Sequence, residues 1–246
     1  MDEVKSKLEA KLGNWASPED GVPVKNIGRV ELPAKNRVII VDKPDSPQSL
    51  ILGGHVIAPS GSAQTLAIET MNEALGGTFT ARVNMNLRED KGWAYGAFTF
   101  TQNGKGQRPW LIYAPVQTDK TKESLQELNK EISGYLGSNP ATAEELSKVK
   151  ENNVRSLPGR FETANSVLSS MMSNANYGRP LNHAVTLPER YQALDLATVR
   201  NSAKETINQN AIIWVIVGDR KAIEGPVRSL GIADIEFWDT DGKIVE

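Results

Sequence analysis

The most diagnostic segment of the chain reads Leu75-Gly76-Gly77-Thr78-Phe79-Thr80-Ala81-Arg82, and it continues to Leu87-Arg88-Glu89-Asp90-Lys91-Gly92-Trp93-Ala94-Tyr95-Gly96. Apolar residues at helical spacing precede the glycine pair, and glycines at such a point typically end a helix. A second helix is expected over residues 80–88 and a strand over residues 94–101, with a glycine at the turn between them. This order of elements would bring Arg88 and Tyr95 to one rim of the fold.

Arg88 and Tyr95 are the candidate substrate-binding residues. Both side chains donate hydrogen bonds and the guanidinium is permanently charged, so together they can hold a peptide carbonyl or stabilise an oxyanion. A structural interpretation also fits: a surface Arg at a helix C-terminus, favoured by the helix dipole, and a half-buried strand Tyr. Spacing alone favours the structural interpretation, because such pairs are common on α+β surfaces.

The order of strands and helices predicts the fold class. Strands are expected at residues 37–41, 48–58, 94–101 and 110–116, the last two joined by a hairpin turn at residues 103–106. Helical spacing and a Thr142–Glu145 capping box predict a run of helices between residues 125 and 207. The apolar run of residues 211–217 predicts a central strand buried on both faces. We therefore expect an α+β fold, a two-layer sandwich in which one mixed, mainly antiparallel sheet has helices packed on one face.

The amino-terminal residues have the pattern of the end of another domain. Apolar residues recur every fourth position from Val4 to Leu12 and Gly13 follows, which predicts a short amphipathic helix with a glycine stop. Residues 14–25 have the Pro, Gly and Asp content of a linker. The expected division is a terminal helix and linker that end a preceding domain, residues 1–23, and one further domain, residues 24–246.

Composition excludes several classes of protein. The net charge of −2 and the scattered basic residues argue against a nucleic-acid partner. The absence of Cys excludes disulfide frameworks, thiolate metal sites and thiol nucleophiles. No run approaches the roughly 20 apolar residues needed to span a bilayer. The compartment is unknown from the sequence; a protein without Cys is compatible with export, so for a bacterial source the periplasm is slightly favoured over the cytoplasm.

His55 and His183 are the only histidines of the chain, and neither is assigned as a metal ligand. Zinc motifs of the H-x-x-E-H and H-E-x-x-H type need two His on one helix face with a Glu as general base, and the sequence contains neither motif. His55 falls in a predicted strand and His183 in a predicted loop after Pro180. The sequence therefore predicts no cofactor and no catalytic residue in this chain.

Residues 75–95 resemble the substrate-side, zinc-free domain of the insulinase/pitrilysin metallopeptidases, the inverzincins. That domain carries a Leu-Gly-Gly, a Ser-Arg-like step and Leu-Arg-Glu-x-x-Gly-x-Ala-Tyr. These correspond here to Leu75-Gly76-Gly77, Ala81-Arg82 and residues 87–95, with Ala81 departing from the frequent Ser. Leu12-Gly13-Asn14-Trp15 is similar to the phrase that closes the preceding domain in this family.

The resemblance implies the non-metal half of a zinc-dependent metalloendopeptidase. Such a half closes the proteolytic chamber, and Arg88 and Tyr95 would bind peptide substrate in it. The zinc is expected in a partner half of the same family, on the same polypeptide or on a separate subunit, so this chain alone would be inactive. The alternative is a catalytically inactive structural or assembly subunit of the same fold. The presence of both Arg88 and Tyr95 favours the protease half.

Overall fold

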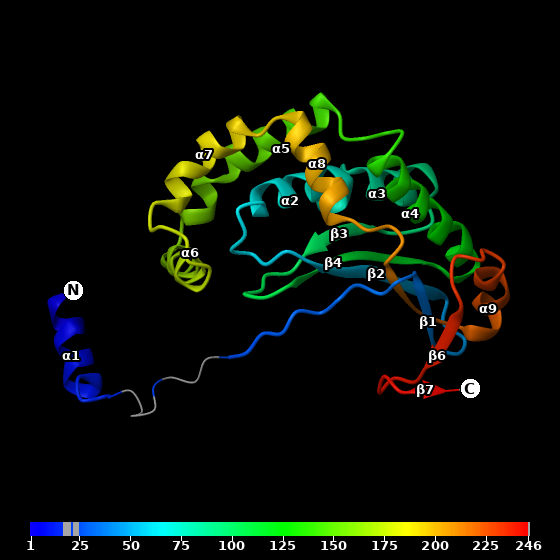
Figure 1. The fold of residues 1–246 in the computed structure, drawn as a ribbon, viewed down its shortest axis with the longest axis horizontal. Coiled ribbons are helices and arrows are strands. Elements are labelled where there is room, and N and C mark those ends of the chain that lie inside the picture. The colour runs from blue at the N-terminus through cyan, green and yellow to red at the C-terminus, as the bar shows by residue number, and fades with distance from the viewer. Residues whose placement is uncertain (17–20, 22–24, 246) are drawn as a thin grey trace.

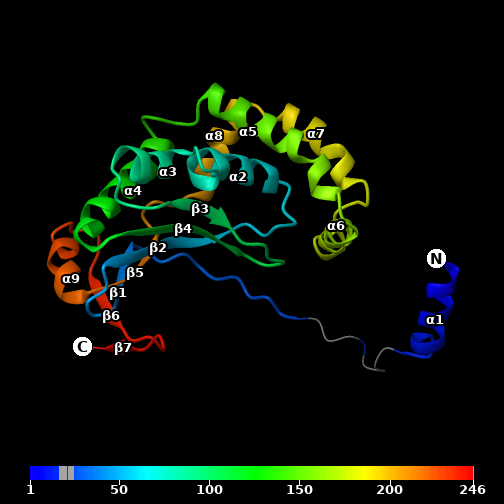
Figure 2. The same ribbon diagram turned by 180° about the vertical axis from the view of Figure 1, so that it is seen from behind.

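The computed structural model describes residues 1–16, 21 and 25–245. Their elements form two layers, an open sheet and a set of helices that covers one of its faces (Figure 1). The view from behind shows the extended segment before the first strand running along the other side of the sheet (Figure 2). The two-layer α+β fold expected from the sequence is confirmed.

Within the described residues, a 7-stranded sheet has the order β3-β4-β2-β5-β1-β6-β7. The strands are β1 Arg37–Asp42, β2 Gln48–Ile57, β3 Phe98–Thr101, β4 Arg108–Gln117, β5 Ile213–Gly218, β6 Ile235–Trp238 and β7 Ile244–Val245. β1 is parallel to β5 and β6, whereas the pairs β2–β4, β2–β5, β3–β4 and β6–β7 are antiparallel. The sheet is therefore mixed and mainly antiparallel.

The helices lie mostly between β4 and β5 in the chain, as predicted. They are α1 Asp2–Leu12, α2 Thr65–Asn72, α3 Arg82–Asn84, α4 Thr121–Leu136, α5 Ala143–Ser156, α6 Ala164–Asn176, α7 His183–Ala193, α8 Leu196–Thr206 and α9 Arg220–Arg228. Two π-helical turns, η1 Glu73–Gly77 and η2 Met85–Asp90, extend α2 and α3, and two 3-10 turns occur at η3 Thr118–Lys120 and η4 Pro158–Phe161. The predicted capping box of Thr142 and Glu145 opens α5.

The hydrophobic core lies between the sheet and the helices. Trp110 of β4 and Trp214 of β5 are fully buried there, with Met71 of α2 among their neighbours in the core. Gly53 of β2 makes room for the indole of Trp214, since a Cβ at Gly53 would lie 2.5 Å from that ring. The glycine in β2 thus allows a close approach of the indole to the backbone of that strand.

β5 is a central strand, paired with both β1 and β2, but the prediction that it is buried on both faces was wrong. Its residues alternate: Trp214 and Ile216 are buried, whereas Ile213 and Val215 are half-buried. The reason is that helices cover only one face of the sheet. On the other face, residues 30–33 lie beside Val215 and give partial cover.

α1 confirms the predicted amino-terminal helix, and Gly13 follows its last residue. None of its residues is buried, and its apolar side chains Val4, Leu8 and Leu12 are 56%, 54% and 54% exposed. The predicted linker falls partly on residues 17–20 and 22–24, which lie outside the described residues. In the part of the chain that is described, no helix combines the length and apolarity needed to cross a membrane.

Candidate functional site

Arg88 lies in η2, the π-helical turn that ends the predicted second helix. Turns of this kind widen the helix and are frequent at functional sites. Gly92 follows with φ +66°, a left-handed conformation that favours glycine, and reverses the chain. The turn is tied to the end of β4 by a 3.0 Å hydrogen bond from Gln117 N to Trp93 O. The sequence therefore gives the Arg88 segment a fixed position beside the sheet.

Tyr95 lies next to Arg88, as predicted, but not in a strand. It occupies a bend between an isolated bridge at Ala94 and β3, which begins only at Phe98. The ladder starts late because the side chain of Asn84, rather than another strand, accepts the Ala97 N–H at 3.0 Å. Tyr95 is 88% exposed, and its ring centroid lies 5.6 Å from the guanidinium carbon of Arg88. The structure thus brings the two candidate residues together at the surface.

Phe79 is a member of the site that sequence reasoning missed. Its ring centroid lies 4.3 Å from the guanidinium carbon of Arg88, and its side chain is 56% exposed. Arg88 therefore contacts two aromatic rings, each worth about 0.5–1 kcal/mol at an exposed site. The only signal in the sequence is a large apolar residue just beyond the Gly76-Gly77 pair, which the periodicity of neither helix requires.

Asn84 positions the backbone beside both aromatic residues. The side chain is fully buried and donates from Nδ2 to Phe79 O at 2.6 Å. Its Oδ1 accepts from Ala97 N, two residues after Tyr95. A single amide thus links the loop that carries Phe79 to the bend that carries Tyr95, because a buried Asn is stable only when its donors and acceptor are engaged.

Arg88 has hydrogen-bonding capacity to spare. Its nearest acidic partner is Glu89, whose Oε1 lies 3.5 Å from Nε. Its Nη1 is shielded from solvent and has no hydrogen-bond partner among the described residues. A buried donor without an acceptor costs about 1–3 kcal/mol, a cost that an incoming carbonyl oxygen would remove. The exposed phenol of Tyr95 adds a second donor beside Arg88, and a peptide carbonyl reaches Nη1 only when a neighbouring side chain moves aside.

Arg82, the other arginine of the motif, is engaged within the protein. It makes a bidentate pair with Glu145, with Nε–Oε1 at 2.5 Å and Nη2–Oε2 at 2.7 Å. It also donates to the carbonyls of Asn139 and Pro140, and its side chain is only 12% exposed. Arg82 therefore joins α3 to α5 and is not available to a ligand.

The glycine pair of the motif has a packing function. A Cβ at Gly76 would lie 2.8 Å from the backbone nitrogen of Thr99 in β3, closer than real Cβ atoms approach. A Cβ at Gly77 would lie 2.9 Å from Nδ2 of Asn72. Gly76 thus lets η1 lie directly against β3, and Gly77 lets it lie close to Asn72 at the end of α2, just before the loop that carries Phe79.

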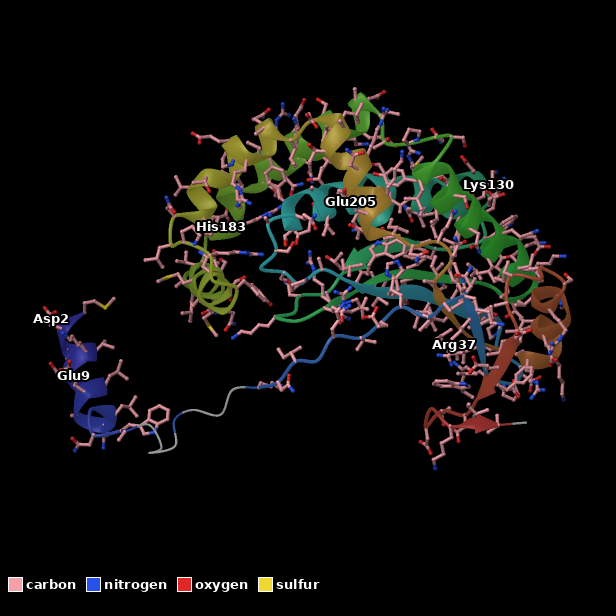
Figure 3. The ribbon with its side chains drawn as sticks, in the orientation of Figure 1. Asp2, Glu9, Arg37, Lys130, His183 and Glu205 are labelled. Carbon is pink, nitrogen blue, oxygen red and sulfur yellow. The ribbon has the colours of Figure 1, made fainter. Side chains whose placement is uncertain are left out.

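The two histidines lie outside the group of Phe79, Arg88 and Tyr95, called here the Arg88 site. His55 is buried in β2, where its Nε2 accepts from Asn208 N at 3.1 Å and its Nδ1 lies 3.0 Å from Val56 O, and burial lowers its pKa. Both ring nitrogens of His55 are therefore engaged within the protein. His183 was wrongly placed in a loop: it begins α7, next to α6 (Figure 3). Helix formation resumes three residues after Pro180, because a proline restricts the residue before it and not those that follow.

Among residues 1–16, 21 and 25–245, no cluster of three or more His, Asp or Glu side chains could hold a metal ion. The hydrogen-bond donors of Arg88 and Tyr95 suit binding of a carbonyl oxygen and stabilisation of negative charge on it.

Comparison with known families gives a match over most of the chain. The family model described as "Peptidase M16 inactive domain" matches residues 1–153, which include every residue of the Arg88 site. A Bacillus subtilis protein named "Uncharacterized zinc protease YmxG" is 25% identical over 190 residues, or 76% of this chain and 46% of that protein. A Helicobacter pylori protein named "Non-peptidase homolog YmxG" is 25% identical over 178 residues, or 72% of this chain and 41% of that protein. The chain therefore spans less than half the length of these two relatives.

A solved structure supports the same fold. The crystal structure of a peptidase M16 inactive domain from Pseudomonas fluorescens superimposes with a TM-score of 0.69 at 20% sequence identity. The superposition covers 78% of this chain and 46% of that one. At this level of identity the similarity establishes the shared architecture.

Proposed function

The chain belongs to the family of peptidase M16 inactive domains, and from this premise we propose that it is the non-metal half of a zinc-dependent metalloendopeptidase. In this role it closes one side of a proteolytic chamber and holds the peptide substrate. The zinc and the general base are supplied by a partner half of the same family. The name of the Bacillus subtilis relative, a zinc protease, supports the proposal, and so does the length of both relatives, which leaves room for a second half.

The observation that carries the proposal is the unpaired Nη1 donor of Arg88 beside the exposed phenol of Tyr95. Attack on a peptide bond builds negative charge on the carbonyl oxygen, and a charged donor interacts with that oxygen more strongly as the charge develops. Arg88 would bind the carbonyl oxygen and Tyr95 would donate a second hydrogen bond. Because Phe79 and Asn84 hold the backbone of the segment in place, the reorganisation on binding would be confined to side chains.

We also assign α1 to the end of a preceding domain. Its apolar positions Val4, Leu8 and Leu12 have no partner among the described residues and stay more than half exposed. An amphipathic helix of this length is marginal without a surface to cover its apolar stripe. A second domain of the same kind, on the same polypeptide, would provide that surface.

A structural or assembly subunit is the second candidate function. It is favoured by the name of the Helicobacter pylori relative, a non-peptidase homologue. In such a subunit the Arg88 site would have no substrate, and loss of the Arg88 guanidinium would leave function intact. The two candidates therefore differ in what substitution of Arg88 and Tyr95 does.

The test uses the chain combined with its zinc-bearing half. Arg88→Ala and Tyr95→Phe should each lower kcat/KM for peptide hydrolysis, because each removes a donor to the carbonyl oxygen. Loss of one such donor costs about 2.7–4 kcal/mol in the transition state, or roughly 10²–10³ in rate. The effect should be larger for Arg88, whose donor is charged. Arg155→Ala is the matched control, because Arg155 is 80% exposed and its ion-pair partner among the described residues is Glu151 on its own helix.

The kinetic constants also separate two roles of the pair. A fall in kcat indicates stabilisation of the oxyanion, whereas a rise in KM alone indicates positioning of the ground-state peptide. Unchanged kcat/KM in both variants, with zinc content and folding intact, would rule out the proposed role and favour the structural subunit.

A further inference from the structure

A cavity of about 590 Å³ is lined by residues of α6, of α7 and of the start of α2. Its volume falls in the range of about 300–1,000 Å³ that small-molecule sites occupy. Its lining includes the charged side chains Arg160, Arg179, Arg190 and Glu69, together with His183. None of these residues belongs to the Arg88 site, so the cavity is a separate feature of the fold.

The three arginines of the cavity differ from the other arginines of the chain. Within the described residues, Arg160, Arg179 and Arg190 have no carboxylate oxygen within 4.0 Å, whereas every arginine outside the cavity except Arg200 has one. Guanidinium groups that share a cavity repel each other, and a nearby carboxylate would reduce that repulsion. The cavity thus collects most of the arginines that lack an acidic partner.

Glu69 does not neutralise this group. Its Oε1 lies 3.3 Å from Nη1 of Arg108, whose side chain is fully buried, so its charge is directed to Arg108. The lining therefore carries an excess of positive charge, although the whole chain has a net charge of −2. A local positive field of this kind attracts anions into a cleft even when the protein as a whole does not.

The hydrogen bonds of the three arginines hold them in place and go to uncharged groups, while the Glu73 carboxylate interacts with Arg160 only at longer range. Arg179 donates from Nη2 to Ser60 O at 2.8 Å, and Arg160 donates from Nη2 to Asn153 Oδ1 at 2.8 Å. Arg190 Nη1 lies 3.2 Å from His183 Nδ1, a geometry in which the neutral imidazole accepts from the guanidinium. All these partners are neutral, and each guanidinium keeps further N–H groups for a ligand.

His183 reports the same electrostatics. Partial burial lowers the pKa of His183, and the nearby positive charges of Arg179 and Arg190 lower it further. An anion seated between these arginines would act in the opposite direction and favour the protonated imidazole. The histidine is therefore a built-in probe of whether the cavity holds an anion.

We propose that this cavity is a binding site for a small multivalent anion that carries phosphate or carboxylate oxygens, held by Arg160, Arg179 and Arg190. Guanidinium groups match both oxyanions, because their N–H donors form bidentate, charge-assisted hydrogen bonds with them. The hydroxyls of Ser62 and Ser173 in the lining add neutral donors. The site is independent of the Arg88 site and of the proposed peptidase function.

The test measures binding of inorganic pyrophosphate and of citrate to the whole chain by calorimetry at fixed ionic strength. Arg179→Gln and Arg190→Gln should each weaken binding by about tenfold or more, since each removes a charged hydrogen bond. Arg155→Gln is the matched control, because it changes net charge equally outside the cavity. Arg190→Lys keeps the positive charge and guards against a loss of folding, and melting temperatures are recorded for all variants.

A second readout is the titration of His183 by NMR. Pyrophosphate or citrate should raise the pKa of His183 by roughly 1 pH unit, the scale on which a neighbouring opposite charge acts. His55 serves as the internal control, because it is buried and hydrogen-bonded elsewhere and should not respond. His183→Gln assigns the signal, since the chain has only two histidines.

The relative affinities of the two anions identify the source of the oxygens. Tighter binding of pyrophosphate indicates a phosphate compound and tighter binding of citrate indicates a polycarboxylate; either result supports the site. The proposal is overturned if neither anion binds or shifts His183, or if Arg155→Gln weakens binding as much as the cavity variants do.

Discussion

Replacement of Arg82 by Ala should destabilise the protein strongly, whereas replacement of Arg88 should not. Arg82 makes two hydrogen bonds to Glu145 and donates to the carbonyls of Asn139 and Pro140. Its guanidinium carbon also lies 5.0 Å from the ring centroid of Tyr135. The substitution removes all of these contacts together and leaves the Glu145 carboxylate, only 27% exposed, without its cationic partner.

The magnitude follows from burial. Removing one partner of a buried ion pair costs about 3–5 kcal/mol, and the partial exposure of Glu145 places Arg82→Ala near 3 kcal/mol. For a domain of this size, that free energy corresponds to a fall in melting temperature of about 6–12 °C. Arg88→Ala loses mainly the contacts of the guanidinium with two exposed rings. Each contact should contribute less than about 1 kcal/mol to the free energy of unfolding. Arg155→Ala breaks an exposed pair and should cost roughly 0–1 kcal/mol.

The assay is thermal unfolding followed by circular dichroism at several pH values. Burial raises the pKa of Glu145, but the hydrogen bonds from Arg82 and Thr142 outweigh it and hold that pKa below its ordinary value. A lowered carboxyl pKa stabilises the folded state above the unfolded pKa of about 4.3, and that stability is lost as pH falls through the folded value. The difference in melting temperature between wild type and Arg82→Ala should therefore be largest above about pH 5 and should become smaller in acid. A melting temperature for Arg82→Ala equal to that of Arg155→Ala at neutral pH would refute this reasoning.

Three further predictions concern stability. Gly76→Ala should lower the free energy of unfolding by about 1–3 kcal/mol, because the new methyl would meet the backbone of Thr99, whereas a Cβ at Gly134 in α4 meets only Asn139 Cβ at 3.8 Å, so Gly134→Ala should be neutral or stabilising; equal urea midpoints would contradict this. Removal of residues 1–20 should lower the melting temperature by only a few degrees, on the scale of roughly 1 kcal/mol, and loss of cooperative unfolding would show that α1 belongs to this domain. Thr142→Ala should cost about 1 kcal/mol through loss of the cap of α5, as measured by chemical denaturation, and an unchanged midpoint would argue against the capping box.

The sequence predicted those features that depend on residues close together in the chain. The capping box of α5 needs only Thr142 and Glu145, three residues apart, and the turn at Gly92 brings Arg88 near Tyr95, although Tyr95 lies in a bend and not in the predicted strand. The family resemblance is confirmed by the match over residues 1–153. The assignment of residues 1–23 to a preceding domain stays a prediction.

The features that the sequence did not predict depend on contacts across the fold. Phe79 follows the point where Gly76 lets η1 lie against β3, and its contact with Arg88 cannot be read from the periodicity of a single helix. Both faces of β5 are apolar in sequence, yet one stays half-buried because the helices cover a single face. The three arginines that line the cavity come from separate segments of the chain, so their grouping without a carboxylate at ion-pair distance becomes visible only in three dimensions.

The most direct measurement of the central claim is peptide hydrolysis and zinc content of this chain, of its zinc-bearing half, and of the two together. Alone, the chain should bind no stoichiometric zinc and hydrolyse no quenched fluorescent peptide. Combined with the zinc-bearing half it should raise kcat/KM well above that of the zinc-bearing half alone, and Arg88→Ala should remove most of the gain while Arg155→Ala keeps it. Chelator-sensitive hydrolysis by the chain alone, or a zinc-bearing half that is equally active without it, would contradict the account.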